Sequence, residues 1–156
     1  MFNIYIDADG CPVVEETRSI AAAFSIPIII VCDTSHELFF DNAETWIVDK
    51  GRDAADYVIL QNMHKHDIVI TQDYGLASLV LSKQGYPLSQ DGLRYTIDNI
   101  DQLLYQRMLS AQLRKQKQHV KHQKKRTKKQ DETFMEALEL LIIEVKKNDE
   151  DTKENI

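Results

Sequence analysis

The feature that most constrains the fold is a set of short aliphatic runs separated by segments with helical periodicity. Residues 2–6 (FNIYI), 26–31 (IPIIIV) and 67–71 (DIVIT) are rich in β-branched residues and have the length of strands. Runs of this kind, with almost no polar alternation, are typical of parallel strands that are covered on both faces. A further strand is predicted at residues 45–48.

Between these runs, apolar residues recur at helical spacing. The order of elements is strand, helix, strand, strand, helix, strand, helix, which predicts an α/β fold with three layers. We therefore expect a mainly parallel sheet with helices on both faces. The predicted helices cover residues 13–24, 53–63, 76–83 and 97–112, with a loop at 32–44 and a turn-rich segment at 89–96.

Charge is unevenly distributed, and its distribution predicts the domain organisation. The net charge is −6, but residues 101–130 alone carry ten basic side chains and one acidic one. We predict an α/β domain at residues 1–112, a basic linker at 113–130, a C-terminal helix packed on the same domain at 131–147 and a disordered tail at 148–156. Asp131 is the expected cap of that last helix.

Composition excludes several classes of protein. Hydrophobic residues make up 43% of the chain, which is enough for a core and excludes wholesale disorder. No apolar run approaches the roughly 18 to 20 residues that span a bilayer, and the acidic start is unlike a signal peptide. Cys11 and Cys32 are too few for a disulfide framework. The expectation is a soluble, cytoplasmic protein with reduced thiols.

Acidic residues follow the predicted strands at the points where the strands end. Asp7 and Asp9 follow the first strand, Asp73 follows the strand DIVIT, and Asp53 and Asp56 begin a helix. Because the carboxyl ends of parallel strands meet at one edge of a sheet, we expect these carboxylates to lie close together.

Clustered carboxylates repel one another unless a cation offsets their charge. Oxygen ligands of this kind suit Mg²⁺ or Mn²⁺, and one or two such ions support phosphodiester hydrolysis. The predicted metal ligands are Asp7, Asp9, Asp53, Asp56 and Asp73, of which Asp7, Asp53 and Asp73 are the predicted catalytic residues.

Each acid also has an ordinary structural explanation. Asp53 and Asp73 are placed to cap helices, Asp56 falls in a first turn where acids are favoured, and Asp9 precedes Gly10 in a turn. Asp7 is the hardest to explain in this way, because it directly ends a buried strand.

Five segments are distinctive in combination: IDADGCP (6–12), KGRDAADYVI (50–59), DIVITQDYGLA (67–77), GLRYTIDNI (92–100) and DETFMEALE (131–139). Over nearly the whole chain they resemble the YaiI/YqxD family of uncharacterised bacterial proteins, which is similar to the PIN-like superfamily. The resemblance implies a PIN-like fold and a Mg²⁺- or Mn²⁺-dependent ribonuclease. It places the metal acids at Asp7 and Asp9, Asp53 and Asp56, and Asp73. The basic residues 114–129 and the loop 33–44 depart from this pattern.

The residues are also consistent with two other functions, of which the first is a phosphatase. IDADG resembles the opening motif of haloacid-dehalogenase phosphatases, with Asp7 as nucleophile and Thr34-Ser35 as the phosphate-binding hydroxyls, but the residues after Asp73 lack the expected second aspartate.

A non-catalytic RNA-binding module is the other hypothesis. The basic tract would contact the phosphates of RNA or another polyanion without recognising sequence, and no aromatic residue interleaves it for base stacking. The predicted nucleic-acid contacts are Arg114, Lys115, Lys117, Lys121, Lys124, Lys125, Arg126, Lys128 and Lys129.

Overall fold

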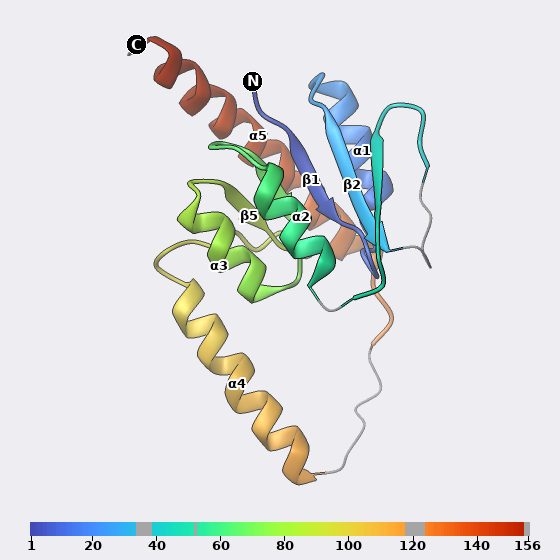
Figure 1. Ribbon diagram of the computed structural model, residues 1–156, viewed down its shortest axis with the longest axis vertical. Helices are drawn as coiled ribbons and strands as arrows, with labels where there is room; N and C mark the ends of the chain where they lie inside the picture. Colours follow the sequence, from blue (N-terminus) through green and yellow to red (C-terminus); the bar gives the residue numbers. More distant parts are fainter. Residues whose placement is uncertain (34–38, 52, 118–123, 155–156) are drawn as a thin grey trace.

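Five strands in one sheet form the centre of the computed structural model, which describes residues 1–33, 39–51, 53–117 and 124–154 (Figure 1). The strand order is β3-β2-β1-β4-β5, and all four pairings are parallel. The strands are β1 (Ile4–Asp7), β2 (Ile28–Asp33), β3 (Glu44–Val48), β4 (Ile68–Ile70) and β5 (Tyr86–Leu88).

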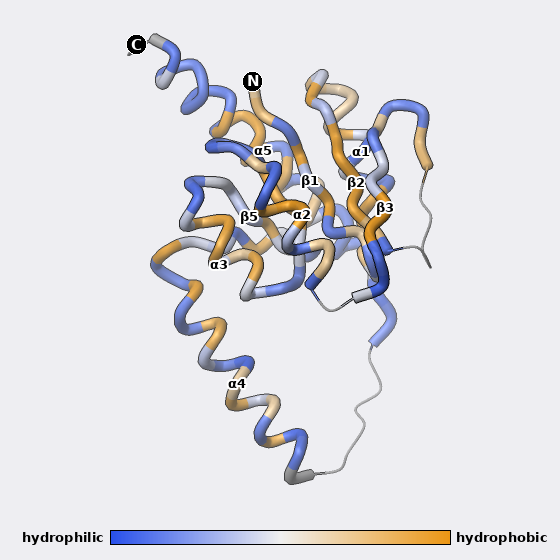
Figure 2. The backbone as a smooth tube through the Cα atoms, viewed as in Figure 1, coloured by the Kyte–Doolittle hydropathy of each residue, from blue (hydrophilic) through white to orange (hydrophobic). Residues whose placement is uncertain are grey.

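Alternate residues of each central strand enter opposite layers of the core. In β1, Ile4 and Ile6 pack in one apolar cluster, whereas Tyr5 packs in the other. All three side chains are at most 2% exposed. The uninterrupted apolar runs in the sequence therefore reflect a sheet that is buried on both faces. Figure 2 shows the strands as the most hydrophobic part of the chain.

Helices cover both faces of the sheet. On one face lie α1 (Val14–Ala23) and α5 (Lys128–Glu154), and on the other lie α2 (Ala54–Asn62) and α3 (Tyr74–Ser82). The helix α4 (Ile100–Lys117) packs its first turns on α3 and then extends away from the sheet (Figure 1). This arrangement confirms the predicted three-layer α/β fold with a parallel sheet and a C-terminal helix.

The strand β5 is the main element that the sequence did not indicate. Gly85 and Pro87 predict only the end of the preceding helix, but the chain turns there and adds residues 86–88 to the sheet beside β4. A proline is tolerated in this position because its two neighbours make the hydrogen bonds to β4: the Tyr86 backbone N–H donates to the Asp67 carbonyl oxygen (2.8 Å), and the Leu88 carbonyl oxygen accepts from the Thr71 backbone N–H (3.0 Å). Leu88 is fully buried, so this short strand completes the core.

The two ends of α5 differ from the predicted bounds. Thr127 and Gln130, not Asp131, cap its start: the Thr127 backbone N–H donates to Gln130 Oε1 (2.8 Å), and the Gln130 backbone N–H donates to Thr127 Oγ1 (3.3 Å). At the other end, residues 148–154 continue the helix where a disordered tail was expected.

Polar contacts to the body of the protein hold this last part of α5. Asn148 Nδ2 donates to the Tyr86 hydroxyl (2.9 Å), and Asp149 Oδ2 lies 2.7 Å from the N-terminal amine of Met1. These partners are far away in sequence, so a local pattern could not reveal them. Upstream, α5 buries an apolar face against the sheet, with Phe134, Leu138, Leu141, Ile142 and Val145 at most 1% exposed.

Within the described residues, no helix combines the length and apolar character needed to cross a membrane.

Candidate metal centre

The candidate site lies between the neighbouring strands β1 and β4, at the point where the strand order of the sheet reverses. The adjacent strands β1 and β4 pair in register from Ile4 with Ile68 to Ile6 with Ile70. The chain leaves β1 toward β2 and leaves β4 toward β5, so the connections diverge at their carboxyl ends. Ligands of open parallel sheets bind at such a point, and Asp7 and Asp73 both lie there.

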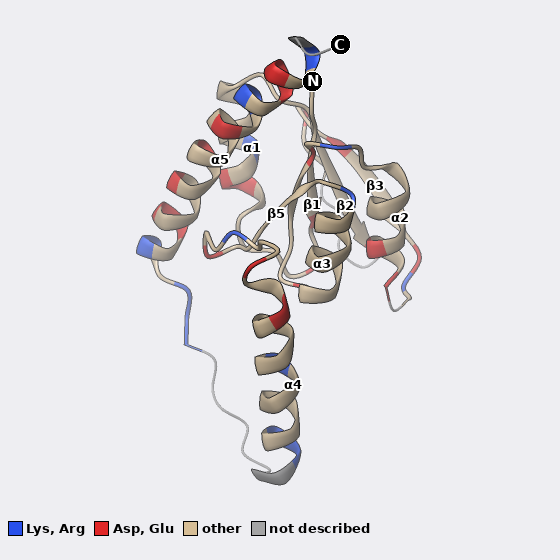
Figure 3. Cartoon of the chain, turned by 90° about the vertical axis from the view of Figure 1, so that its left-hand side faces the viewer, with Lys and Arg blue, Asp and Glu red and all other residues tan. Residues whose placement is uncertain are grey.

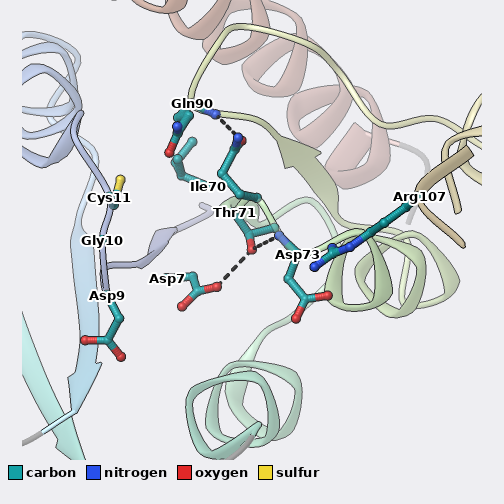
Figure 4. Close-up of a pocket in the computed structure, with 10 residues that line it drawn as sticks. Asp7, Asp9, Gly10, Cys11, Ile70, Thr71, Asp73, Gln90 and Arg107 are labelled. Carbon is teal, nitrogen blue, oxygen red and sulfur yellow. Dashed lines mark hydrogen bonds between the residues drawn. The ribbon is translucent and has the colours of Figure 1, made fainter. Parts of the chain in front are cut away.

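Asp7 is the last residue of β1 and is half-buried. Burial raises the pKa of its carboxyl group, and the charges of Asp73 and Asp9 raise it further. A hydrogen bond from Thr71 Oγ1 to Asp7 Oδ2 (2.9 Å) acts in the opposite direction (Figure 4). Thr71, itself buried, therefore orients the carboxylate.

Asp73 both caps a helix and belongs to the acidic site. Its Oδ1 accepts hydrogen bonds from the backbone N–H groups of Gly75 (2.8 Å) and Leu76 (3.1 Å) at the start of α3. Its own backbone N–H donates to Thr71 Oγ1 (3.0 Å), so one threonine hydroxyl links Asp73 to Asp7. The prediction that Asp73 caps a helix is confirmed, and the same residue also belongs to the acidic site.

The side chain of Asp53 does not cap α2 as the capping explanation predicts. It precedes α2 with a left-handed backbone (φ 67°), and its side chain makes no capping hydrogen bond to the described residues of the helix. A non-glycine residue in this conformation costs on the order of 1 kcal/mol or more, and such residues concentrate at functional sites. The left-handed turn directs the Asp53 carboxylate to the acidic group described next.

Asp53, Asp56 and Asp73 each offer a carboxylate oxygen, and these oxygens all lie within 4.8 Å of one another. The pKa of Asp56 rises to about 7, chiefly because of burial and then because of the charges of Asp73 and Asp7, the hydrogen bond with Asp73 and the charge of Asp53. A site that makes one carboxylate this reluctant to ionise, and that consists of hard oxygen donors, fits a divalent cation such as Mg²⁺ or Mn²⁺.

The three carboxylates open into a cavity of about 170 Å³, here called the acidic cavity, which Asp7 and Asp9 also line. The Asp9 carboxylate accepts from the backbone N–H of Asp33 at 3.1 and 3.2 Å, so it joins the end of β1 to the end of β2. Of the five acids singled out in the sequence, three form the close group, and the other two lie beside it. Asp49, which follows the third predicted strand, also lines this cavity, as does Asp33 at the end of β2.

A neighbouring cavity of about 350 Å³, here called the outer cavity, is lined mostly by residues that were not predicted as site residues (Figure 4). It shares Asp7, Asp9 and Asp73 with the acidic cavity. Thr71 could have been noticed, because it is a polar residue at the end of a strand. The rest of its wall comes partly from the distinctive segments 6–12 and 67–77, as Gly10, Cys11, Ile70 and Gln72, and partly from Gln90 and Arg107, which no predicted motif contains.

The hydroxyls required by the phosphatase alternative, Thr34 and Ser35, lie outside the described residues. The structure does place Asp7 at the end of the first strand, as that alternative needs. Asp73 is followed directly by α3, whose first residues are Tyr74 and Gly75.

The basic residues divide into three groups in the structure. Arg126 is held by the protein itself: its Nε lies 2.6 Å from Asp131 Oδ1, its Nη1 lies 2.8 Å from Asp91 Oδ1, and its Nη2 donates to the Gln90 carbonyl oxygen (2.6 Å). Lys121 lies outside the described residues. The others occur near the end of α4 and just before or at the start of α5 (Figure 3), at Arg114, Lys115, Lys117, Lys124, Lys125, Lys128 and Lys129.

Fold and site together define an α/β protein with an acidic candidate metal centre at the carboxyl edge of a parallel sheet. The chain belongs to the family described as "Uncharacterized BCR, YaiI/YqxD family", whose model matches residues 5–144. This finding confirms the resemblance seen in the sequence.

Similar proteins cover almost the same length. A UPF0178 protein of Clostridium acetobutylicum is 39% identical over 143 residues, which is 90% of this chain and 97% of that protein. One of Natranaerobius thermophilus is 41% identical over 92% of this chain and 98% of its own length, and one of Bacillus cereus is 44% identical over 90% and 99%. No solved structure matches the chain.

Proposed function

We propose that this protein is a nuclease that depends on Mg²⁺ or Mn²⁺ and hydrolyses phosphodiester bonds in RNA. The observation that carries the proposal is the close group of Asp53, Asp56 and Asp73, in which the pKa of Asp56 rises to about 7. Burial and the repulsion among these carboxylates make the charged form of Asp56 costly in the folded protein, and a bound cation would offset this cost. RNA as the substrate follows from the resemblance to PIN-like ribonucleases.

In this proposal, Asp53, Asp56 and Asp73 hold one or two ions, with Asp7 and Asp9 beside them. A bound divalent ion polarises a phosphoryl oxygen and lowers the pKa of water. Asp73 is rigid, because the first turn of α3 holds its Oδ1.

Asp7 has a second task in this proposal. Thr71 engages Oδ2 of Asp7, so Oδ1 is the oxygen that accepts a proton from the attacking water.

The decisive experiment measures cleavage of a fluorescently labelled single-stranded RNA by the purified full chain with Mg²⁺, Mn²⁺ or EDTA. We expect cleavage that needs the metal and falls by roughly 100-fold in Asp73→Asn, since asparagine keeps the helix cap but loses the charge. Asp41→Asn is the matched control, because Asp41 is exposed and precedes β3 at the opposite edge of the sheet.

Two results would contradict the proposal. Cleavage that persists unchanged in Asp73→Asn would come from another protein in the preparation. Metal-independent or absent cleavage, combined with a trifluoroberyllate adduct on Asp7 and phosphate release from a phosphomonoester, would identify the phosphatase instead.

A further inference from the structure

The outer cavity continues beyond the acidic site along α4. Arg107 of α4 lines its wall, and Figure 4 shows its guanidinium extending toward Asp73, across the cavity from Gly10 and Cys11. A further cavity of about 340 Å³ follows, lined by Tyr74, Leu103, Gln106 and Ser110 among others. The two cavities adjoin at Gln72 and Arg107, which line both of them, and together they are here called the α4 groove.

Arg107 is held in place in this groove. Its guanidinium carbon lies 5.4 Å from the centre of the Tyr74 ring, a cation–π contact. Tyr74 in turn packs edge-on against the buried Tyr95, with ring centres 5.6 Å apart. Among the described residues, no carboxylate forms a salt bridge with Arg107, so its charge remains available to an anion.

A second cation lies on the same face of α4. Arg107, Ser110 and Arg114 follow one another at spacings of three and four residues, which places them on one side of the helix. Arg114 Nε donates to the Ser110 carbonyl oxygen (3.3 Å), and this bond keeps the Arg114 side chain beside the groove. At a rise of 1.5 Å per residue, Arg107 and Arg114 are about 10 Å apart along the axis.

We infer that the α4 groove binds a single strand of RNA, with Arg107 contacting a phosphate next to the acidic site and Arg114 contacting one further along. This inference rests on the proposed function, because it states how the substrate of that site is held. An arginine presents paired N–H donors that match a phosphate. Cations placed along a groove attract the backbone of a single strand, and here these cations are Arg107 in the wall and Arg114 further along α4.

The shape of the site favours a single strand over a duplex. Asp7 is half-buried, and four segments surround the outer cavity: the residues after β1, those after β4, Gln90 after β5, and α4. A phosphodiester can reach the bottom of such a recess only when its strand is separated from a partner. Ser110 and Gln106 line the groove with polar groups that tolerate any base sequence.

The test measures binding of an uncleavable 2′-O-methyl RNA by fluorescence anisotropy at several salt concentrations. The background is Asp56→Asn/Asp73→Asn without metal, which reduces the acidic charge and keeps the result independent of any metal chemistry. Arg107→Gln is compared with Lys65→Gln, which removes the same charge from an exposed residue before β4, at the opposite edge of the sheet.

We expect Arg107→Gln to weaken binding by about 10-fold, as for loss of one charged hydrogen-bonded contact. The slope of log K against log salt should fall by about 0.7, the value for one phosphate contact on a single strand. Arg107→Lys should keep the slope but lose part of the affinity. Lys65→Gln should leave both unchanged.

Equal binding by the two glutamine variants would overturn the inference, as would absence of RNA binding or equal affinity for a duplex of the same sequence. Thermal unfolding of the Arg107→Gln chain must match that of its parent, which the exposure of Arg107 leads us to expect. Stabilisation of the unmodified chain by Mn²⁺ is measured separately. Its absence would refute the metal site of the proposed function, whereas unchanged RNA binding in Arg107→Gln would refute only the groove.

Discussion

Replacing Asp56 by asparagine isolates the electrostatic cost of the acidic site. In the folded protein the pKa of Asp56 is about 7 instead of 3.8. At 1.36 kcal/mol per unit, this difference sets an upper limit of about 4 kcal/mol on the destabilisation. Solvent screens a half-buried carboxylate, so we expect about 1 to 2 kcal/mol.

The sign of the pH dependence follows from the direction of the shift. Because the folded pKa is raised, the folded protein retains a proton that the unfolded chain has lost between pH 4 and pH 7. The free energy of unfolding therefore falls as the pH rises through this window, and the full cost is present above about pH 7. The asparagine side chain carries no charge at any pH, so Asp56→Asn should match the unmodified chain near pH 4 to 5 and exceed it at pH 8.

The assay is urea unfolding in EDTA between pH 5 and pH 8, followed by fluorescence of Trp46, the single tryptophan, which packs against Tyr5 in the core. With Mn²⁺ at 100 times its dissociation constant, the unmodified chain should gain about 2.7 kcal/mol, and Asp56→Asn should gain much less. Asp41→Asn should change neither quantity. A variant less stable than the unmodified chain at pH 8, or a difference that does not vary with pH, would refute this reasoning.

Three further predictions concern the fold, each measured by urea unfolding. Phe134→Ala should cost about 3 to 5 kcal/mol, because Phe134 is fully buried between α5 and the sheet, while Leu140→Ala on the exposed side should cost less than about 0.5 kcal/mol. Arg126→Gln should cost about 1 to 3 kcal/mol, since it breaks two ion pairs at the start of α5; no loss would show that this contact is dispensable. Gly85→Ala should cost about 1 to 3 kcal/mol, because the new methyl group would lie 2.5 Å from Met63 Cε, and an unchanged midpoint would mean that the neighbours yield freely.

Much of the framework could be predicted from local patterns. The apolar runs that became β1, β2 and β4 are long enough and continuous enough to be buried on both faces, and the helical spacing between them predicts the covering layers. Asp7, Asp53, Asp56 and Asp73 could be predicted to lie together for the same reason. A parallel sheet brings the residues after its strands to one edge, whatever the rest of the chain does.

What the local patterns could not predict depends on contacts between distant residues. The edge strand β5 exists because β4 supplies its hydrogen bonds, and the end of α5 is helical because Met1 and Tyr86 hold it. In the sequence, Arg107 falls in the predicted helix 97–112 and Arg126 in the predicted basic linker 113–130, and neither segment indicates the partners of its arginine.

The tertiary structure gives these two arginines opposite surroundings. It surrounds Arg126 with the carboxylates of Asp91 and Asp131, and it places Arg107 in a groove beside the acidic site. Hydrophobic periodicity depends only on neighbours along the chain, and it is therefore sufficient to predict the layers and the edge at which the acids gather. The partners of a charged side chain depend on which distant segments the packed core brings next to it, and no pattern of neighbours along the chain contains that information.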